Sequence, residues 1–229
     1  MLIKGLQKTT LLDFPGKVAC TVFTGGCNFR CPFCHNASLV MNPASVDTIS
    51  EESFFSFLSK RKGILDGVCI TGGEPTLMPD LRAFCERIKS MGFSVKLDTN
   101  GTRPDLLRAL MDDGLIDYVA MDIKNSMETY AATCGLPSFP EGVEESMDLL
   151  LGGKIPYEFR TTIVRELHTP ETVEALAKRI RGAERYFLQL FTDSGDLIGS
   201  GMSAPTEEEA NAMLAAARIH IPCAALRGV

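Results

Sequence analysis

Apolar runs of strand length alternate with amphipathic stretches of helix length along the chain from residue 18 onward. The pattern predicts strands at 18–24, 67–71, 93–98, 117–124, 157–164 and 186–191. In the helical stretch after the second of these, apolar residues recur at steps of three and four, at Leu81, Phe84, Cys85, Ile88 and Met91. Strands separated by helices join a parallel sheet through right-handed crossovers. The sequence therefore predicts an α/β protein, either an open doubly wound sheet or a barrel.

Charged residues on three of the predicted strands favour the barrel. One face of each strand is apolar, and the other face carries Lys96, Asp98, Asp122, Lys124, Glu158 and Arg160. A strand buried on both faces of a parallel sheet is usually almost entirely apolar, and a buried unpaired charge is costly. We therefore expect a partial, open (β/α)6 TIM-like barrel with parallel strands and a wet lumen that holds a ligand. The alternative is that these strands lie at a sheet edge and expose one face to water.

The chain shows no internal repeat, low-complexity tract or Gly/Ser linker, so we expect residues 1–229 to form a single domain. Residues 1–17 would be a lead segment, 18–191 the barrel and 192–229 a C-terminal docking segment. Thr206 and Glu209 have the spacing of a capping box, which predicts that this last segment contains a docked helix.

Net charge excludes some partners. Twenty-three basic and 29 acidic side chains give a net charge of -6, with no long run of either sign. Nucleic-acid duplexes and anionic membranes attract concentrated positive charge, so we expect neither as a partner. The first residues resemble no signal peptide and no window is apolar enough to span a bilayer, which predicts a cytoplasmic protein. Thiols stay reduced there, so the eight cysteines indicate metal binding or catalysis rather than disulfides.

Three of the cysteines lie on one glycine-led loop after the first predicted strand, in the segment GGCNFRCPFCHN at 25–36. Cys27, Cys31 and Cys34 have the spacing C-x3-C-x2-C, and soft thiolates select zinc, copper(I) or iron–sulfur clusters. A closed zinc site needs four ligands, and the only nearby candidate is His35, which adjoins Cys34 and is awkward to aim at the same ion. A cubane cluster on three cysteines would leave one iron open to substrate, and a structural zinc site is the alternative.

This loop, with Phe33 as the aromatic residue before the last cysteine, resembles the signature of the radical S-adenosylmethionine (SAM) enzymes. The resemblance implies a partial barrel of the radical SAM type. It also implies a [4Fe–4S] cluster on Cys27, Cys31 and Cys34, whose open iron is chelated by the amino and carboxylate groups of SAM. Phe33 is expected to contact the cofactor.

A second motif, TGGEP at 71–75, stands where the second predicted strand ends. Its two glycines let a ligand approach the backbone closely, and Glu74 offers a carboxylate to a cation. Because it follows the cysteine loop at the next strand end, it resembles the GGE motif of the same family. That resemblance implies that Gly72, Gly73 and Glu74 meet the methionine ammonium of SAM. The alternative is an ordinary turn between a strand and a helix.

Later strand ends resemble pyruvate formate-lyase activating enzyme, in DTNG at 98–101 and MDIK at 121–124. The resemblance implies that Asp98, Thr99 and Asp122 help hold a monovalent cation, Na⁺ or K⁺, beside the SAM carboxylate. Asn100 and Lys124 belong to the same expected cofactor-binding group. The alternative is a salt bridge between these charges inside the lumen, without any ion.

The last two predicted strands each supply one candidate. Arg160 is expected to meet an anionic group, either of SAM or of an incoming peptide. Gln189 lies on the strand where relatives cover the adenine of SAM. We expect His168 to be a capping or surface histidine, His220 a helix-end residue, and most of the remaining cysteines buried thiols: Cys20, Cys69, Cys85, Cys134 and Cys223.

Segments throughout the chain, including GLQKTTLLDFPGK at 5–17 and YEFRTT at 157–162, resemble the activating proteins of anaerobic ribonucleoside-triphosphate reductase. The resemblance implies an oxidoreductase that reductively cleaves SAM at the cluster. The resulting deoxyadenosyl radical would take hydrogen from a glycine of that partner and leave a glycyl radical, with electrons from a low-potential donor such as flavodoxin or ferredoxin. Residues 127–142 are expected to close over the substrate.

Two other functions stay open at this stage. The same scaffold could act on a small molecule, as a deazapurine-precursor synthase of the radical SAM type does. From a different class, the chain could be an iron–sulfur electron carrier that is not an enzyme. A three-cysteine site with an open iron suits substrate binding better than electron relay.

Overall fold

The computed structural model describes residues 1–228, which form one curved eight-stranded sheet in the order β1 to β8. All neighbouring pairs from β2 to β8 are parallel, and β1 runs antiparallel to β2 at one edge. Within residues 1–228 the two edge strands do not pair with each other, so the barrel is open. The predicted open α/β barrel of parallel strands is therefore confirmed. The strands are β1 (Ile3–Thr10), β2 (Ala19–Thr24), β3 (Gly67–Gly72), β4 (Ser94–Thr99), β5 (Tyr118–Asp122), β6 (Tyr157–Ile163), β7 (Tyr186–Leu190) and β8 (Ala225–Arg227).

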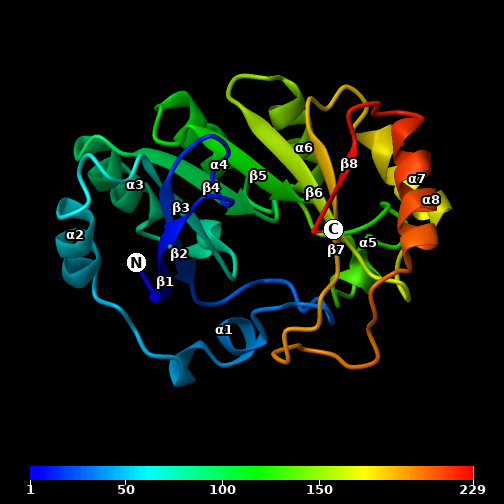
Figure 1. Ribbon diagram of the computed structural model, residues 1–229, viewed down its shortest axis with the longest axis horizontal. Helices are drawn as coiled ribbons and strands as arrows, with labels where there is room; N and C mark the ends of the chain where they lie inside the picture. Colours follow the sequence, from blue (N-terminus) through cyan, green and yellow to red (C-terminus); the bar gives the residue numbers. More distant parts are fainter. Residues whose placement is uncertain (229) are drawn as a thin grey trace.

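Helices follow most of the strands and cover the outer side of the sheet (Figure 1). On the opposite side, α1 lies beside the segment between β7 and α8, where the Ala37 backbone N–H donates to the Asp196 carbonyl over 3.3 Å. The helices are α1 (Ala37–Met41), α2 (Glu51–Ser59), α3 (Leu81–Ser90), α4 (Pro104–Asp112), α5 (Tyr130–Thr133), α6 (Val143–Leu151), α7 (Pro170–Arg179) and α8 (Glu207–Arg218), with single 3₁₀ turns η1 (Pro43–Ser45) and η2 (Pro75–Leu77).

Two strands were absent from the sequence-based prediction. In β1, apolar and polar residues do not alternate clearly, because it is an edge strand whose second half is mostly exposed. β8 has only three residues, too few for a pattern. The six predicted strands agree with the structure except at their ends; the segment predicted at 117–124, for example, is Tyr118–Asp122. The lead segment thus contributes a strand to the sheet.

Local capping explains where the longer helices begin. Ser50 caps α2 by accepting a hydrogen bond from the Ser53 backbone N–H. The predicted capping box at α8 is confirmed, because Thr206 accepts from the Glu209 backbone N–H and Glu209 accepts from the Thr206 backbone N–H. α8 then packs beside α7, as Figure 1 shows, so the C-terminal segment is docked as expected.

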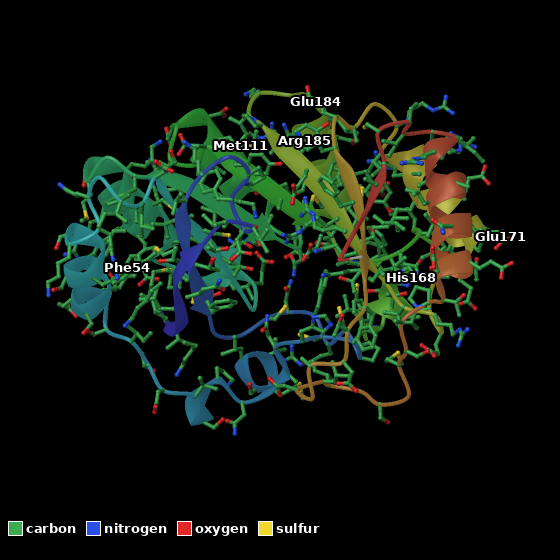
Figure 2. All side chains as sticks on the ribbon, viewed as in Figure 1. Phe54, Met111, His168, Glu171, Glu184 and Arg185 are labelled. Carbon is green, nitrogen blue, oxygen red and sulfur yellow. The ribbon has the colours of Figure 1, made fainter. Side chains whose placement is uncertain are left out.

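The faces of the central strands are those that the sequence predicts. Val95 and Leu97 of β4 are buried in the apolar core, and Lys96 and Asp98 on its other face form an ion pair. The edge-strand alternative is wrong, because β4, β5 and β6 lie in the middle of the sheet. In Figure 2 the core residue Phe54, on α2, lies in one half of the molecule, and His168, just before α7, lies in the other. No helix within residues 1–228 is long and apolar enough to cross a membrane.

Candidate active site

The cysteine loop crosses the carboxyl ends of the first parallel strands. The Gly26 backbone N–H donates to the Leu39 carbonyl over 2.8 Å, and the Cys34 N–H closes a turn onto the Cys31 carbonyl over 3.0 Å. The Cys27 Sγ accepts a hydrogen bond from the Phe29 backbone N–H at 3.3 Å. All three cysteine side chains line one cleft; Cys31 is buried, and Cys27 and Cys34 are half-buried.

The arrangement of the thiols fits a cluster better than a single ion. Among residues 1–228, no three His, Cys, Asp or Glu side chains converge closely enough to hold one metal ion. His35 also lines the cleft, but its ring lies 5.5 Å from the Phe191 ring. A cube offers separate corners to separate thiolates, so thiols that line a cleft wall suit it. Burial raises the pKa of Cys27 to about 12, so iron binding as a thiolate would release this proton.

The two glycines after β3 hold that strand end against the cysteine loop. A Cβ on Gly73 would lie 1.9 Å from the Gly26 carbonyl oxygen, and one on Gly72 would lie 2.3 Å from the Thr24 backbone nitrogen. Gly72 also has φ +113°, which side-chain-bearing residues rarely adopt. From the sequence, we expected these glycines to let a ligand approach the backbone closely. In the structure, the chain's own backbone makes the close approach.

Glu74 braces the ends of β3 and β4 from inside the protein. Its Oε1 accepts hydrogen bonds from the Thr76 backbone N–H, the Thr76 hydroxyl and the Thr99 hydroxyl, and its Oε2 accepts from the Asn100 N–H at 2.7 Å. Burial raises the pKa of Glu74 although these hydrogen bonds act to lower it. The motif glutamate is thus fully engaged by neutral donors from its own chain.

Five of the charged residues in the lumen form one ion-pair network. Arg160 Nε donates to Asp122 Oδ1 over 2.8 Å, and Arg160 Nη1 donates to Asp98 Oδ2 over 3.2 Å. Lys96 pairs with the second oxygen of Asp98, and Lys124 pairs with Asp122 at 3.2 Å. Two carboxylates therefore face three cations.

The cations of this network determine the direction in which the pKa values of its two aspartates shift. Burial raises the pKa of Asp122, but Arg160 and Lys124 outweigh it and lower that pKa below its ordinary value. Burial likewise opposes ionisation of Asp98, yet Arg160 and Lys96 lower its pKa. The network is fully charged at neutral pH and carries one net positive charge, which favours an anionic ligand group.

The structure brings nearly all of the predicted site residues to one cleft of about 820 Å³ that includes its open mouth. Its lining includes Cys27, Cys31, Phe33, Cys34, Gly72, Gly73, Glu74, Asp98, Thr99, Asn100, Asp122 and Lys124. Arg160 and Gln189 line an adjoining cleft, which shares Asp98 and Asp122 with the first.

Several residues that line the clefts were not among the site residues predicted from the sequence. His35 and Thr71 border both clefts, as does Thr162, and the Asn36 side-chain amide donates to the Gly72 carbonyl over 3.1 Å. His35 and Asn36 follow the last cysteine directly, and Thr71 precedes the two glycines, so adjacency to a motif was the available clue. Thr162 faces inward by strand alternation from Arg160.

One expectation about a flanking residue is wrong. His168 is neither a cap nor a surface residue: it is buried, its Nδ1 accepts from the Val164 N–H at 3.0 Å, and its Nε2–H donates to the Lys124 carbonyl at 2.8 Å. Closure of residues 127–142 over a substrate stays a prediction; their helix α5 packs into the core. His220 lies just after α8, as expected.

The other cysteines are mostly buried thiols, as predicted; Cys20, Cys69, Cys85 and Cys134 are buried and Cys223 is exposed. Two of the buried thiols lie near charged or reactive groups. Cys69 faces Lys96 and Asp98 in the lumen. Cys134, the residue after α5, is held to the cysteine loop by its carbonyl, which accepts a hydrogen bond from the Arg30 backbone N–H over 2.8 Å.

An open parallel barrel whose cleft lies at the carboxyl ends of its strands has the architecture of a barrel enzyme. The family model described as "Radical SAM superfamily" matches residues 21–180, and the chain belongs to this superfamily. Membership implies a [4Fe–4S] cluster and SAM as cofactors.

Individual relatives narrow the comparison. Over 217 residues the chain is 33% identical to a protein of Methanocaldococcus jannaschii named "Putative glycyl-radical enzyme activating enzyme", a match that covers 91% of this chain and 88% of the relative. It is 29% identical to the 7-carboxy-7-deazaguanine synthase of Haemophilus influenzae over 165 residues, which are 72% of this chain and 62% of the synthase. A solved domain of the pyruvate-formate lyase-activating enzyme from Bacteroides vulgatus superposes with a TM-score of 0.58 at 20% identity, over 71% of this chain and 99% of that domain.

Proposed function

We propose that the protein activates a glycyl-radical enzyme, and specifically an anaerobic ribonucleoside-triphosphate reductase. The observation that carries this proposal is the match to the M. jannaschii protein, which covers 91% of this chain and 88% of that relative. The match to the deazaguanine synthase leaves more than a third of the synthase uncovered, since it spans 62% of it. The partner would be the reductase, and a low-potential donor such as flavodoxin or ferredoxin would supply electrons.

Cys27, Cys31 and Cys34 would hold the cluster in this reaction, because they line one cleft with two of them partly open to it. When bound, the cluster supplies the electron that breaks a sulfonium C–S bond of SAM, and the deoxyadenosyl radical so formed takes hydrogen from the partner's glycine. The net positive ion-pair network would orient the SAM carboxylate. Gly72 and Gly73 keep the end of β3 against the cluster loop, and Glu74 holds that end in place.

The monovalent cation is the less favoured of the two interpretations of the lumenal charges. Both carboxylates of the predicted cation site already have cationic partners. Asp98 pairs with Lys96 and Arg160. Asp122 pairs with Arg160 and Lys124. Thr99 donates its hydroxyl to Glu74. We expect activity to be the same in sodium and potassium buffers, and a requirement for one ion that is lost in Asp122→Ala would favour the cation instead.

The decisive experiment is an anaerobic incubation of the reduced, iron-loaded protein with SAM and a reductase of the glycyl-radical type. We expect deoxyadenosine to form and a doublet signal to appear in electron paramagnetic resonance of the reductase. Cys34→Ala should abolish both, and Cys85→Ala, which changes a buried thiol outside the cleft, should leave both intact.

Three other results would contradict the proposal. Deoxyadenosine without a radical on the reductase, together with turnover of a small molecule, would indicate the synthase type of reaction. Unaltered SAM with a reducible cluster would indicate an electron carrier. Zinc at one equivalent without acid-labile sulfide would indicate a structural zinc site.

A further inference from the structure

His168, which lies just before α7 (Figure 2), holds the end of β5 to the turn that follows β6. The turn closes because the Leu167 and His168 backbone N–H groups both donate to the Val164 carbonyl, over 3.1 and 2.9 Å. The buried His168 ring accepts at Nδ1 from the Val164 N–H at 3.0 Å, and its Nε2–H donates to the Lys124 carbonyl at 2.8 Å. Burial lowers the pKa of His168, which favours the neutral ring that both contacts need.

A second contact holds the same two segments together. The side chain of Asn125, the residue after Lys124, is buried, and its amide donates to the Leu167 carbonyl over 2.8 Å and to the Thr133 hydroxyl over 2.9 Å. The turn at 164–168 therefore contacts two consecutive residues after β5. We call these two contacts, His168 to Lys124 and Asn125 to Leu167, the β5–β6 clasp.

The clasp acts on a charged residue of the cleft. Lys124 lines the cleft beside Asp122, with which its ammonium pairs at 3.2 Å, while its backbone carbonyl is held by His168. The His168 ring also packs edge-on against the ring of Phe33 in the cysteine loop, with centroids 6.4 Å apart. A lysine side chain is long and flexible, so its ammonium has a defined place only where the backbone that carries it is fixed.

We propose that His168 is a positioning residue of the SAM site: its donation to the Lys124 carbonyl fixes the backbone from which the Lys124 ammonium reaches an anionic group of the ligand. Asn125 supports it by keeping the turn that carries His168 in place. A binding group that is fixed before the ligand arrives lowers the entropic cost of binding, so loss of the clasp weakens binding without removing a charge. The inference deepens the proposed function and rests on SAM as the ligand of this cleft.

Two substitutions of His168 separate its hydrogen bonds. Glutamine places its amide nitrogen as many bonds from Cβ as the imidazole places Nε2, so His168→Gln keeps a donor for the Lys124 carbonyl. Asparagine is shorter and places its oxygen as many bonds from Cβ as the imidazole places Nδ1, so His168→Asn keeps only the acceptor for the Val164 N–H. Both variants lose the ring contact with Phe33, so an effect of packing alone would appear in both.

The test is equilibrium binding of SAM to the full-length, iron-loaded protein, with iron and sulfide analysis and urea unfolding of each variant. We expect the Kd of SAM to rise about tenfold in His168→Asn and to stay within about threefold of the wild type in His168→Gln. Asn125→Ala, which removes the supporting contact, should raise the Kd about threefold.

A double-mutant cycle with Lys124 shows whether His168 acts through that residue. Lys124→Met should itself raise the Kd about tenfold or more, because it removes a charged partner of the ligand. Adding His168→Asn to Lys124→Met should then change the Kd by no more than about twofold. The control is Tyr118→Phe, which removes a buried hydrogen bond to Glu158 at the other end of β5 and should leave the Kd unchanged.

Several outcomes would overturn the inference while the proposed function stands. One is a wild-type Kd in His168→Asn. Another is an equal rise in His168→Gln or in Tyr118→Phe, because the effect would then be one of packing or of general stability. A third is a rise of about tenfold when His168→Asn is added to Lys124→Met, since His168 would then act independently of the ammonium.

The remaining outcomes separate the inference from the proposed function. If His168→Asn cannot be loaded with iron, Asn125→Ala decides: a rise that disappears in the Lys124→Met background supports the inference, and an unchanged Kd overturns it. Failure of the wild-type protein to hold a cluster or to bind SAM overturns the proposed function and the inference with it. Absence of a radical on the reductase, with SAM binding intact, overturns the proposed function alone.

Discussion

Two acidic sites at neighbouring strand ends are stabilised in opposite ways. Glu74, after β3, has no cationic partner among residues 1–228 and accepts its hydrogen bonds from the neutral groups of Thr76, Thr99 and Asn100. Asp98 and Asp122, on β4 and β5, are held by cations instead. The contrast separates a carboxylate that braces backbone from carboxylates that adjust the charge of the lumen.

The difference has a consequence for ligand binding. The Glu74 carboxylate accepts four hydrogen bonds from the chain itself and so fixes the shape of the cleft wall. The lumen network has three cations and two carboxylates, so it has one net positive charge that can attract an anionic ligand group. Substitutions in the brace should therefore mainly change stability, and substitutions in the network should also change SAM binding.

The largest expected effect comes from removing the brace. Glu74→Ala would leave donors from Thr76, Thr99 and Asn100 without an acceptor in a buried place, so the free energy of unfolding should fall by about 4 kcal/mol. Glu74→Gln keeps Oε1 and should lose about 1.5 kcal/mol. Urea unfolding measures both. Equal losses in the two variants would mean that the carboxylate charge, rather than hydrogen-bond acceptance, matters.

The second largest effect is expected from removing Arg160, the cation that both aspartates of the network share. In Arg160→Met each aspartate keeps a lysine partner, so we expect a loss of about 2 kcal/mol in stability, below the usual cost of breaking a buried pair. SAM affinity should fall at least tenfold, measured by equilibrium binding to the loaded protein. The control is Arg108→Met, whose exposed pair with Glu145 should contribute about 0.5 kcal/mol or less and leave SAM affinity unchanged.

The pH dependence of stability should differ in sign between the two sites. The pKa values of Asp98 and Asp122 are lower in the folded protein than their ordinary 3.8, so their stabilisation is present above that pH and is lost as the pH falls further. The pKa of Glu74 is raised above 4.5, so its contribution to stability falls as the pH rises through that value.

Urea titrations between about pH 2 and pH 6 can resolve these two limbs, because the acidic limb lies below pH 3.8 and the other limb above pH 4.5. Asp122→Asn should flatten the acidic limb, and Glu74→Gln should flatten the limb above pH 4.5. If Asp122→Asn leaves the acidic limb unchanged, the network does not hold its carboxylates ionised in the way the ion pairs indicate.

The smallest effect concerns salt. Raising ionic strength should weaken the exposed Arg108–Glu145 pair, whose coupling in a double-mutant cycle should be about 0.3 kcal/mol and vanish in high salt. The Arg160–Asp122 coupling should be larger and should persist, because both groups are largely shielded from solvent. A salt-sensitive Arg160–Asp122 coupling would place the lumen network in open water and remove the contrast with Glu74.

Much of the fold was predictable because it follows from local patterns of apolar and polar residues in the sequence. Alternating apolar runs and amphipathic stretches located six strands, and charges on one face of 93–98 and 157–164 indicated a lumen. The missed strands β1 and β8 fail this test, because one is half-exposed at an edge and the other is three residues long. Their place depends on pairing partners rather than on their own pattern.

Part of the candidate site was predictable for the same reason. Cys27, Cys31 and Cys34 share one short loop, so their proximity follows from chain connectivity alone. The packing of α5, within residues 127–142, against the cysteine loop was not predictable, because a segment between two elements gives no sign of which surface it packs against. The environment of His168 depends likewise on Lys124, which lies on a different strand end.

The sequence by itself determined which residues carry the chemistry: three soft ligands on one turn, and charges that alternate with apolar residues along individual strands. Only the tertiary structure decided their partners. It placed Glu74 beside neutral donors on β4, Asp122 beside Arg160 on the next strand, and the Arg30 backbone N–H of the cysteine loop beside the Cys134 carbonyl. The physical reason is that contacts within a turn or a strand follow from backbone geometry, whereas contacts between distant segments exist only after burial brings them together.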